Sequence, residues 1–96
     1  VSVIDVSSKS VVETVPVGDG PVGAWPGEDN HMYTDNEEGQ SITEIDVASR
    51  KALSVINLGF MPAYAAYNLS TEELWVTNPE EGMVHLYSKK SGTWSE

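Results

Sequence analysis

The chain contains no cysteine among its 96 residues, so neither a disulfide nor a thiolate metal site can form. Basic residues are also scarce, since 5 Lys and Arg stand against 15 Asp and Glu and give a formal net charge of -10. The only adjacent basic pairs are Arg50-Lys51 and Lys89-Lys90, whereas phosphate surfaces require clustered Lys and Arg. No apolar run approaches the roughly 20 residues of a membrane-spanning helix. We therefore expect no nucleic-acid partner and no membrane insertion.

Apolar residues at helical spacing are missing as well. Short β-branched runs separated by Gly, Pro, Asn and Asp fill the chain, which is typical of an all-β fold. Along residues 10–17 the two-residue side-chain period places Val11, Val15 and Val17 on one face. The first strand has apolar residues on both faces, which predicts a sheet stacked between two others. We predict ten strands, at residues 1–6, 10–17, 21–25, 31–36, 41–47, 51–58, 63–68, 73–78, 83–88 and 92–94.

The chain also repeats itself with a period of 41 to 42 residues. At an offset of 41 residues Ile4-Asp5-Val6 aligns with Ile45-Asp46-Val47, and an offset of 42 then aligns Tyr33 with Trp75. Four short strands per period of about 40 residues are typical of a β-propeller, in which blade-shaped sheets stack around a channel. We predict a single partial propeller over residues 1–96, of about two and a half four-stranded blades. Its repeats are residues 1–40, residues 41–82 and a truncated third, residues 83–96.

One short motif permits comparison with a known family. Trp75-Val76-Thr77-Asn78 differs by one aromatic residue from the Tyr-Val-Thr-Asn motif of YVTN-type propeller repeats, found in archaeal surface-layer and bacterial secreted proteins. Val1-Ser2-Val3-Ile4-Asp5 and Pro21-Val22-Gly23 also resemble that repeat, whereas Tyr33-Thr34-Asp35-Asn36 departs from the motif. The resemblance covers nearly the whole chain. It implies a propeller at the cell surface, in the periplasm or outside the cell, and it implies no shared set of catalytic residues.

The function expected from this resemblance is that of a noncatalytic scaffold or recognition segment of a larger cell-envelope or extracellular protein. Its partners would be the rest of the propeller, in the same or another chain, and a protein or glycan ligand. Propellers have roughly four to eight blades, so we expect the chain to be a fragment or part of a larger protein. The alternative to a fragment is an independently folded β-meander with partly exposed edges, which we favour less because open edges invite aggregation. The alternative is part of a propeller enzyme, either a cofactor- or metal-dependent oxidoreductase or a lactone hydrolase, whose active-site residues the sequence does not identify.

Acidic residues at the ends of the predicted strands and in the turns between them are the candidates for a calcium site, because calcium binds six to eight oxygens. Acidic clusters occur at Glu28-Asp29-Asn30, Asp35-Asn36-Glu37-Glu38 and Glu80-Glu81. The candidate ligands are Asp35, Glu37, Glu38, Glu80 and Glu81. Their spacing matches no complete calcium loop, and acidic residues also form turns, so we assign no cofactor. The two histidines, His31 and His85, occupy nonequivalent repeat positions without a second local ligand, and we interpret them as half-exposed strand residues.

Several polar residues are interpreted as turn formers. Asp5 and Asp46 follow Ile4 and Ile45, where an Asp side chain accepts hydrogen bonds from backbone N–H groups ahead of it. The other two predicted turn residues are Asn36 and Asn78, each at the end of a predicted strand.

Two further motifs have simple interpretations. Residues 18–23 spell G-x-G-x-x-G, but Ala24-Trp25-Pro26-Gly27 follows where a dinucleotide site needs a helix, so we predict a turn and no cofactor. Asn68-Leu69-Ser70 is an N-glycosylation sequon, which makes Asn68 a modification candidate if the protein is exported.

Overall fold

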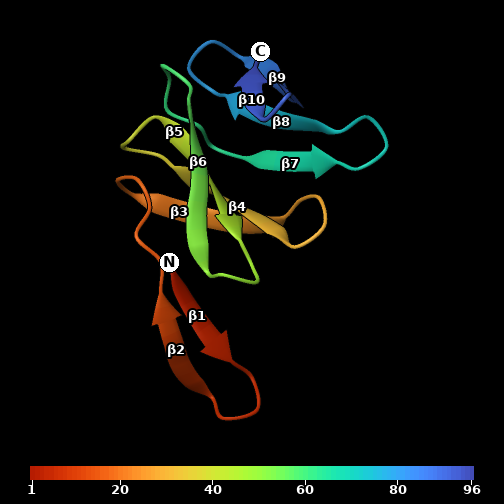
Figure 1. The fold of residues 1–96 in the computed structure, drawn as a ribbon. Coiled ribbons are helices and arrows are strands. Elements are labelled where there is room, and N and C mark those ends of the chain that lie inside the picture. The colour runs from red at the N-terminus through yellow and green to blue at the C-terminus, as the bar shows by residue number, and fades with distance from the viewer.

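The computed structural model describes residues 1–96 and contains ten strands and no helix (Figure 1). The strands are β1 (Ser2–Asp5), β2 (Ser10–Thr14), β3 (Pro21–Pro26), β4 (His31–Asn36), β5 (Ser41–Asp46), β6 (Lys51–Asn57), β7 (Ala65–Asn68), β8 (Glu73–Asn78), β9 (Met83–Lys90) and β10 (Thr93–Ser95). Each predicted strand overlaps one of them, so the all-β prediction is confirmed. No helix is long and apolar enough to span a membrane.

The strands form three antiparallel sheets. The first sheet is the β1–β2 hairpin, the middle sheet has the order β3-β4-β5-β6, and the last sheet has the order β10-β9-β8-β7. Figure 1 shows the first sheet at one end of the molecule, the last sheet at the other end, and the middle sheet between them. Neighbouring strands in each sheet are also neighbours in the sequence, because every connection within a sheet is a short hairpin turn.

The β1–β2 and β5–β6 hairpins have the same local structure. Asp5 Oδ2 accepts a hydrogen bond from the Ser8 N–H, and Asp46 Oδ2 accepts one from the Ser49 N–H, each at 2.7 Å. The turns then close through residues with left-handed backbone, namely Lys9 (φ 57°) and Arg50 (φ 59°). These carboxylates are therefore placed where they stabilise a turn, and the hydrogen bonds from Ser8 and Ser49 lower the pKa of both Asp side chains.

The main core lies between the middle and last sheets. Its buried residues are Tyr33, Ile42, Ile56, Phe60, Ala65, Leu74, Val76 and Tyr87. The ring of Tyr33 in β4 stacks on Tyr67 in β7 at a centroid distance of 5.7 Å and meets Trp94 in β10 edge-on at 5.8 Å. Aromatic contacts of this kind fix how two sheets lie on each other, in addition to burying apolar area.

The first sheet packs on the middle sheet through one face only. Val15, just after β2, is 1 % exposed, whereas Ile4 and Val6 on the other side of the hairpin are 60 % and 86 % exposed. The expectation that the first strand is covered on both faces is therefore wrong, because no sheet lies beyond β1–β2. The strands covered on both faces are in the middle sheet: Ser41 through Ile45 of β5 are all buried, and so are Tyr33 through Asn36 of β4.

A candidate site between the middle and last sheets

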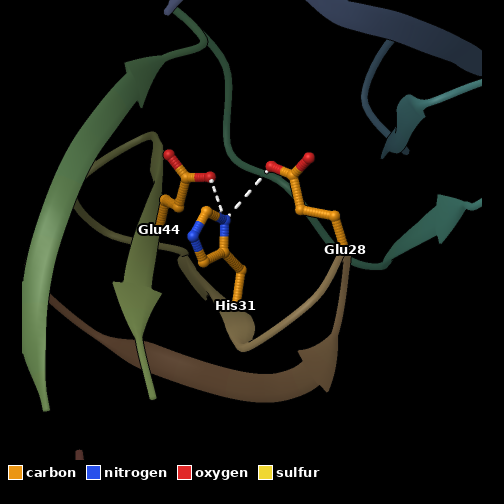
Figure 2. A group of neighbouring side chains, drawn as sticks. All are labelled: Glu28, His31 and Glu44. Carbon is orange, nitrogen blue, oxygen red and sulfur yellow. Dashed lines mark hydrogen bonds and ion pairs between the residues drawn. The ribbon is translucent and has the colours of Figure 1, made fainter. Parts of the chain in front are cut away.

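Three side chains that can bind metal ions converge at one end of the middle sheet (Figure 2). Glu28 lies in the turn between β3 and β4, His31 is the first residue of β4, and Glu44 lies in the centre of β5. His31 Nδ1 is 3.1 Å from Glu28 Oε1 and 3.0 Å from Glu44 Oε2. Both carboxylates therefore face the same imidazole nitrogen.

The β3–β4 turn positions Glu28 and His31. The His31 N–H donates to the Glu28 carbonyl at 2.9 Å, the Gly27 N–H donates to the His31 carbonyl at 3.0 Å, and Asn30 has left-handed backbone (φ 58°). A Cβ on Gly27 would overlap the ring of Tyr33, so the turn passes this ring closely only because residue 27 is glycine. Tyr33 is directly opposite Glu44 in the β4–β5 register.

Glu44 is the most buried member of the site, with a side chain 1 % exposed. Its carboxylate accepts hydrogen bonds from Ser54 Oγ at 2.7 Å and from Tyr33 Oη at 3.0 Å. Lys89 Nζ, on β9 of the last sheet, donates to the same carboxylate at 2.7 Å. A buried carboxylate needs such partners because removing it from water without them costs several kcal/mol.

These contacts determine the protonation states. Burial alone would raise the pKa of Glu44, but hydrogen bonds from Lys89, Ser54 and Tyr33 outweigh it and lower this pKa to about 2. Burial and the neighbouring Glu44 charge raise the pKa of Tyr33 far above its ordinary value. Burial, together with the charge of Glu28, raises the pKa of Tyr67 to about 12. At neutral pH Glu44 is therefore ionised and both tyrosines are neutral.

Lys89 joins the site to the last sheet. Its Nζ is 2.7 Å from Glu44 Oε2 and 3.4 Å from Glu28 Oε1, and it lies 5.1 Å from the centre of the Trp94 ring. The Lys89 side chain is 25 % exposed, so its ammonium stays near water while pairing with the buried carboxylate. The site therefore holds two carboxylates and one ammonium group beside the imidazole.

A cleft leads from solvent to this site. It has a volume of about 320 Å³ and is lined by Glu28, Asp29, His31, Tyr67, Leu69 and Glu72. Glu28 and His31 form part of the cleft wall and also face Glu44, so they connect the cleft with the buried carboxylate. Three carboxylates on the wall favour cations over anions.

The arrangement is better suited to binding a cation than to nucleophilic catalysis. Ser54 donates its hydroxyl hydrogen to Glu44, as a nucleophile donates to its base. A general base works best with a pKa near the operating pH, and a carboxylate with a pKa of about 2 has little tendency to take that proton. An imidazole with two carboxylates, by contrast, is a donor set that divalent metal ions use.

The acidic residues predicted as calcium ligands do not belong to this cluster. Asp35 is buried, and its Oδ1 accepts a hydrogen bond from the Gly23 N–H at 2.7 Å. Glu37 and Glu38 lie in the β4–β5 turn, and Glu80 and Glu81 lie in the β8–β9 turn. The calcium site at these residues stays a prediction.

Sequence reasoning noted the acidic cluster Glu28-Asp29-Asn30 but did not connect it with His31 or Glu44. His31 is a half-exposed strand residue, as predicted, but Glu28 lies beside it, because the turn brings Glu28 Oε1 to 3.1 Å from His31 Nδ1. The available clue was Glu44, because it is a charged residue two positions after Ile42 and so shares the inward face of β5 with it. His85 lies elsewhere, with its Nδ1 2.6 Å from Glu96 Oε2 and its ring stacked on Phe60.

The three asparagines singled out from the sequence lie at strand ends. Asn36 is fully buried, and its Nδ2 donates to Thr43 Oγ1 at 2.8 Å. Asn78 Oδ1 accepts from the Glu81 N–H at 3.4 Å. Asn68 is half-buried at the end of β7, and its Oδ1 accepts from the Ser70 N–H at 3.0 Å.

The G-x-G-x-x-G segment has no helix after it. Residues 18–20 end the connection from the first to the middle sheet, and β3 follows directly.

No family model matches the chain, and no curated protein matches it significantly. The resemblance to YVTN-type repeats therefore stays a prediction.

Proposed function

We propose that the chain is a run of consecutive β-propeller blades that acts as a noncatalytic scaffold or recognition segment of a larger cell-envelope or extracellular protein. The observation that supports this proposal is the apolar surface on the outward faces of both end sheets. At positions aligned by the 41- to 42-residue repeat, the side chains of the middle sheet are buried, whereas those of the first and last sheets are exposed. The outward faces of these two end sheets therefore have the apolar composition of buried interfaces.

The outward face of the last sheet shows this most clearly. Trp75 and Leu86 are directly opposite each other on β8 and β9, and they are 43 % and 38 % exposed. The aligned residues of the middle sheet are Tyr33 and Glu44, which are 0 % and 1 % exposed because the last sheet covers them. Val84, which is 50 % exposed, likewise aligns with fully buried Ile42. A further sheet beyond β7–β10 would bury this face in the same way.

The outward face of the first sheet gives the same result at the other end. Ile4 is 60 % exposed, and its aligned residue Ile45 in the middle sheet is 7 % exposed because the first sheet covers it. Val6 and Val11 are also exposed on this hairpin. Fully burying one such side chain contributes about 1.5–3 kcal/mol, so leaving several exposed at both ends forgoes considerable stability. This supports additional blades on both sides, in the same or another chain.

The site between the middle and last sheets also supports a structural role. Lys89 of β9 bonds to Glu44 of β5 at 2.7 Å, so the charged groups link two sheets directly. Loops at the sheet ends would then offer a recognition surface for a protein or glycan ligand, as loops held by a rigid scaffold commonly do.

The experiment is sedimentation velocity of the 96-residue chain over a range of concentrations, with electron microscopy of any assembled species. We expect association through the end sheets, and rings of roughly four to eight blades would match a propeller. Trp75→Glu should weaken this association about tenfold or more, because it places a charge in the centre of the apolar face. Leu53→Glu is the matched control, since Leu53 is 52 % exposed on β6, an edge strand of the middle sheet. A strictly monomeric wild-type chain would contradict the proposal.

A further inference from the structure

We propose that Glu28, His31 and Glu44 form a binding site for one first-row divalent transition-metal ion, and that Lys89 occupies this site as an internal cation until the metal displaces it. This goes beyond the scaffold role, which requires only that Lys89 links two sheets. It rests on the geometry of the three donor atoms, on the charge of the site and on its access to solvent.

The donor atoms have the spacing of a coordination shell. Metal–nitrogen and metal–oxygen bonds of about 2.0–2.2 Å place adjacent ligand atoms about 2.8–3.6 Å apart in octahedral or tetrahedral geometry. His31 Nδ1 lies 3.1 Å from Glu28 Oε1 and 3.0 Å from Glu44 Oε2, and the three donor atoms lie within 4.8 Å of one another. One ion can therefore contact all three with small side-chain movements, leaving its other positions for water.

The charge of the site favours a divalent ion. With a neutral imidazole, which metal binding requires, the two carboxylates exceed the single Lys89 ammonium by one negative charge. Replacing that ammonium with a divalent ion makes the local charge neutral. One imidazole among the ligands favours ions such as Zn²⁺ or Co²⁺ over Ca²⁺ and Mg²⁺, which prefer oxygen ligands only.

The exchange of Lys89 for a metal has a route. The acidic cleft reaches Glu28 and His31 from solvent, with Asp29 and Glu72 on its wall. Lys89 is partly exposed near the end of β9. Its flexible four-carbon side chain allows the ammonium group to rotate away from Glu44 and into the solvent. Glu44 cannot leave, because Ser54 and Tyr33 hold its carboxylate within the core. The site thus has one fixed ligand, two ligands at the cleft and a displaceable cation.

The test is Co²⁺ and Zn²⁺ binding to the full chain, measured by calorimetry and by the visible absorption of bound Co²⁺. We expect one ion per chain, with affinity lowered about tenfold or more by His31→Ala and by Glu28→Gln, because each change removes a ligand. Lys89→Met should raise the affinity about tenfold, since no ammonium then competes. His85→Gln is the control, because His85 pairs with Glu96 away from the site, and Ca²⁺ should not displace Co²⁺.

Two results would overturn this proposal. One is the absence of Co²⁺ binding at millimolar metal in both the wild type and Lys89→Met. The other is binding that persists unchanged in folded His31→Ala or that falls equally in His85→Gln, which would locate the ion elsewhere. Glu28→Gln changes a side chain 35 % exposed, so it serves as the ligand variant if His31→Ala does not fold. The association measurements described above do not depend on metal, so the two proposals can fail separately.

Discussion

Acid should destabilise this protein mainly through Glu44. The pKa of this carboxyl is about 2 in the folded chain against an ordinary value of 4.5, because hydrogen bonds and Lys89 outweigh the effect of burial. A lowered pKa means that the folded state favours the ionised form, so this contribution is fully present above about pH 4.5. It is lost progressively as the pH falls from about 4.5 towards 2.

The magnitude follows from the size of the shift. A difference of about 2.5 pKa units corresponds to about 3 kcal/mol of unfolding free energy, at about 1.4 kcal/mol per unit. Small domains have only about 5–15 kcal/mol in total, so this loss is large enough to approach unfolding at low pH. Asp5 and Asp46 also have lowered pKa values, so they too add to the loss of stability in acid. Both lie exposed in turns, and their effect is the same in the wild type and in every variant that retains them.

The assay is urea unfolding followed by tryptophan fluorescence between pH 2 and pH 7, with a chelator present. The comparison variant is Glu44→Leu/Lys89→Val, which removes both charges and leaves Asp5 and Asp46 in place. We expect its unfolding free energy to fall about 3 kcal/mol less than that of the wild type between pH 5 and pH 2. The same pH dependence in both proteins would refute the assignment of this effect to Glu44.

Three further substitutions test individual contacts. Tyr33→Phe should lower the unfolding free energy by about 2 kcal/mol in urea titrations, because Glu44 loses a donor at 3.0 Å; a change near zero would mean that water replaces the hydroxyl. Gly27→Ala should destabilise by about 1–3 kcal/mol because its Cβ would overlap the Tyr33 ring, whereas an unchanged melting temperature would show that the turn moves freely. Asp46→Ala should lower the melting temperature through loss of the Ser49 contact, with Zn²⁺ affinity unchanged; reduced affinity at an unchanged melting temperature would make Asp46 part of the site.

The strands could be predicted because their determinants are local. β4 and β8 have the predicted bounds, since β-branched and aromatic residues alternate between turn residues on either side. The error at β1 had a nonlocal cause. Its sequence has apolar residues on both faces, but Ile4 is exposed because none of the three sheets covers the outward face of β1–β2.

The site could not be predicted because it depends on sheet stacking. Lys89 is 45 residues from Glu44 and 61 from Glu28 along the chain, and only the packing of the last sheet on the middle sheet brings it to them. The sequence does place Glu44 at an inward position of β5, but alternation alone names no partner for its charge. The contact between His31 and Glu28 has a local cause, because the β3–β4 turn brings Glu28 beside His31, but it depends on a turn geometry that the residue spacing alone does not specify.

The interface between the first and middle sheets differs from that between the middle and last sheets at a pair of positions that the repeat aligns. This difference predicts which sheets can pack on each other. Val3 and Val47 line one cleft between the first and middle sheets. The aligned residues between the middle and last sheets are Glu44 and Lys89, which form an ion pair at 2.7 Å.

A buried ion pair is often no more stabilising than apolar residues of similar size, but a charge facing an apolar surface is strongly unfavourable. Glu44 therefore disfavours pairing of the middle sheet with a sheet that carries an apolar residue at the position of Lys89, such as Val6. Lys89 likewise disfavours pairing of the last sheet with a sheet that carries an apolar residue at the position of Glu44, such as Leu86. In Glu44→Leu/Lys89→Val we expect more association states in sedimentation velocity, because that restriction is gone. Its stability at neutral pH should be lower, because Tyr33 Oη and Ser54 Oγ lose their acceptor. A single association state identical to that of the wild type would show that the ion pair does not select the neighbouring sheet.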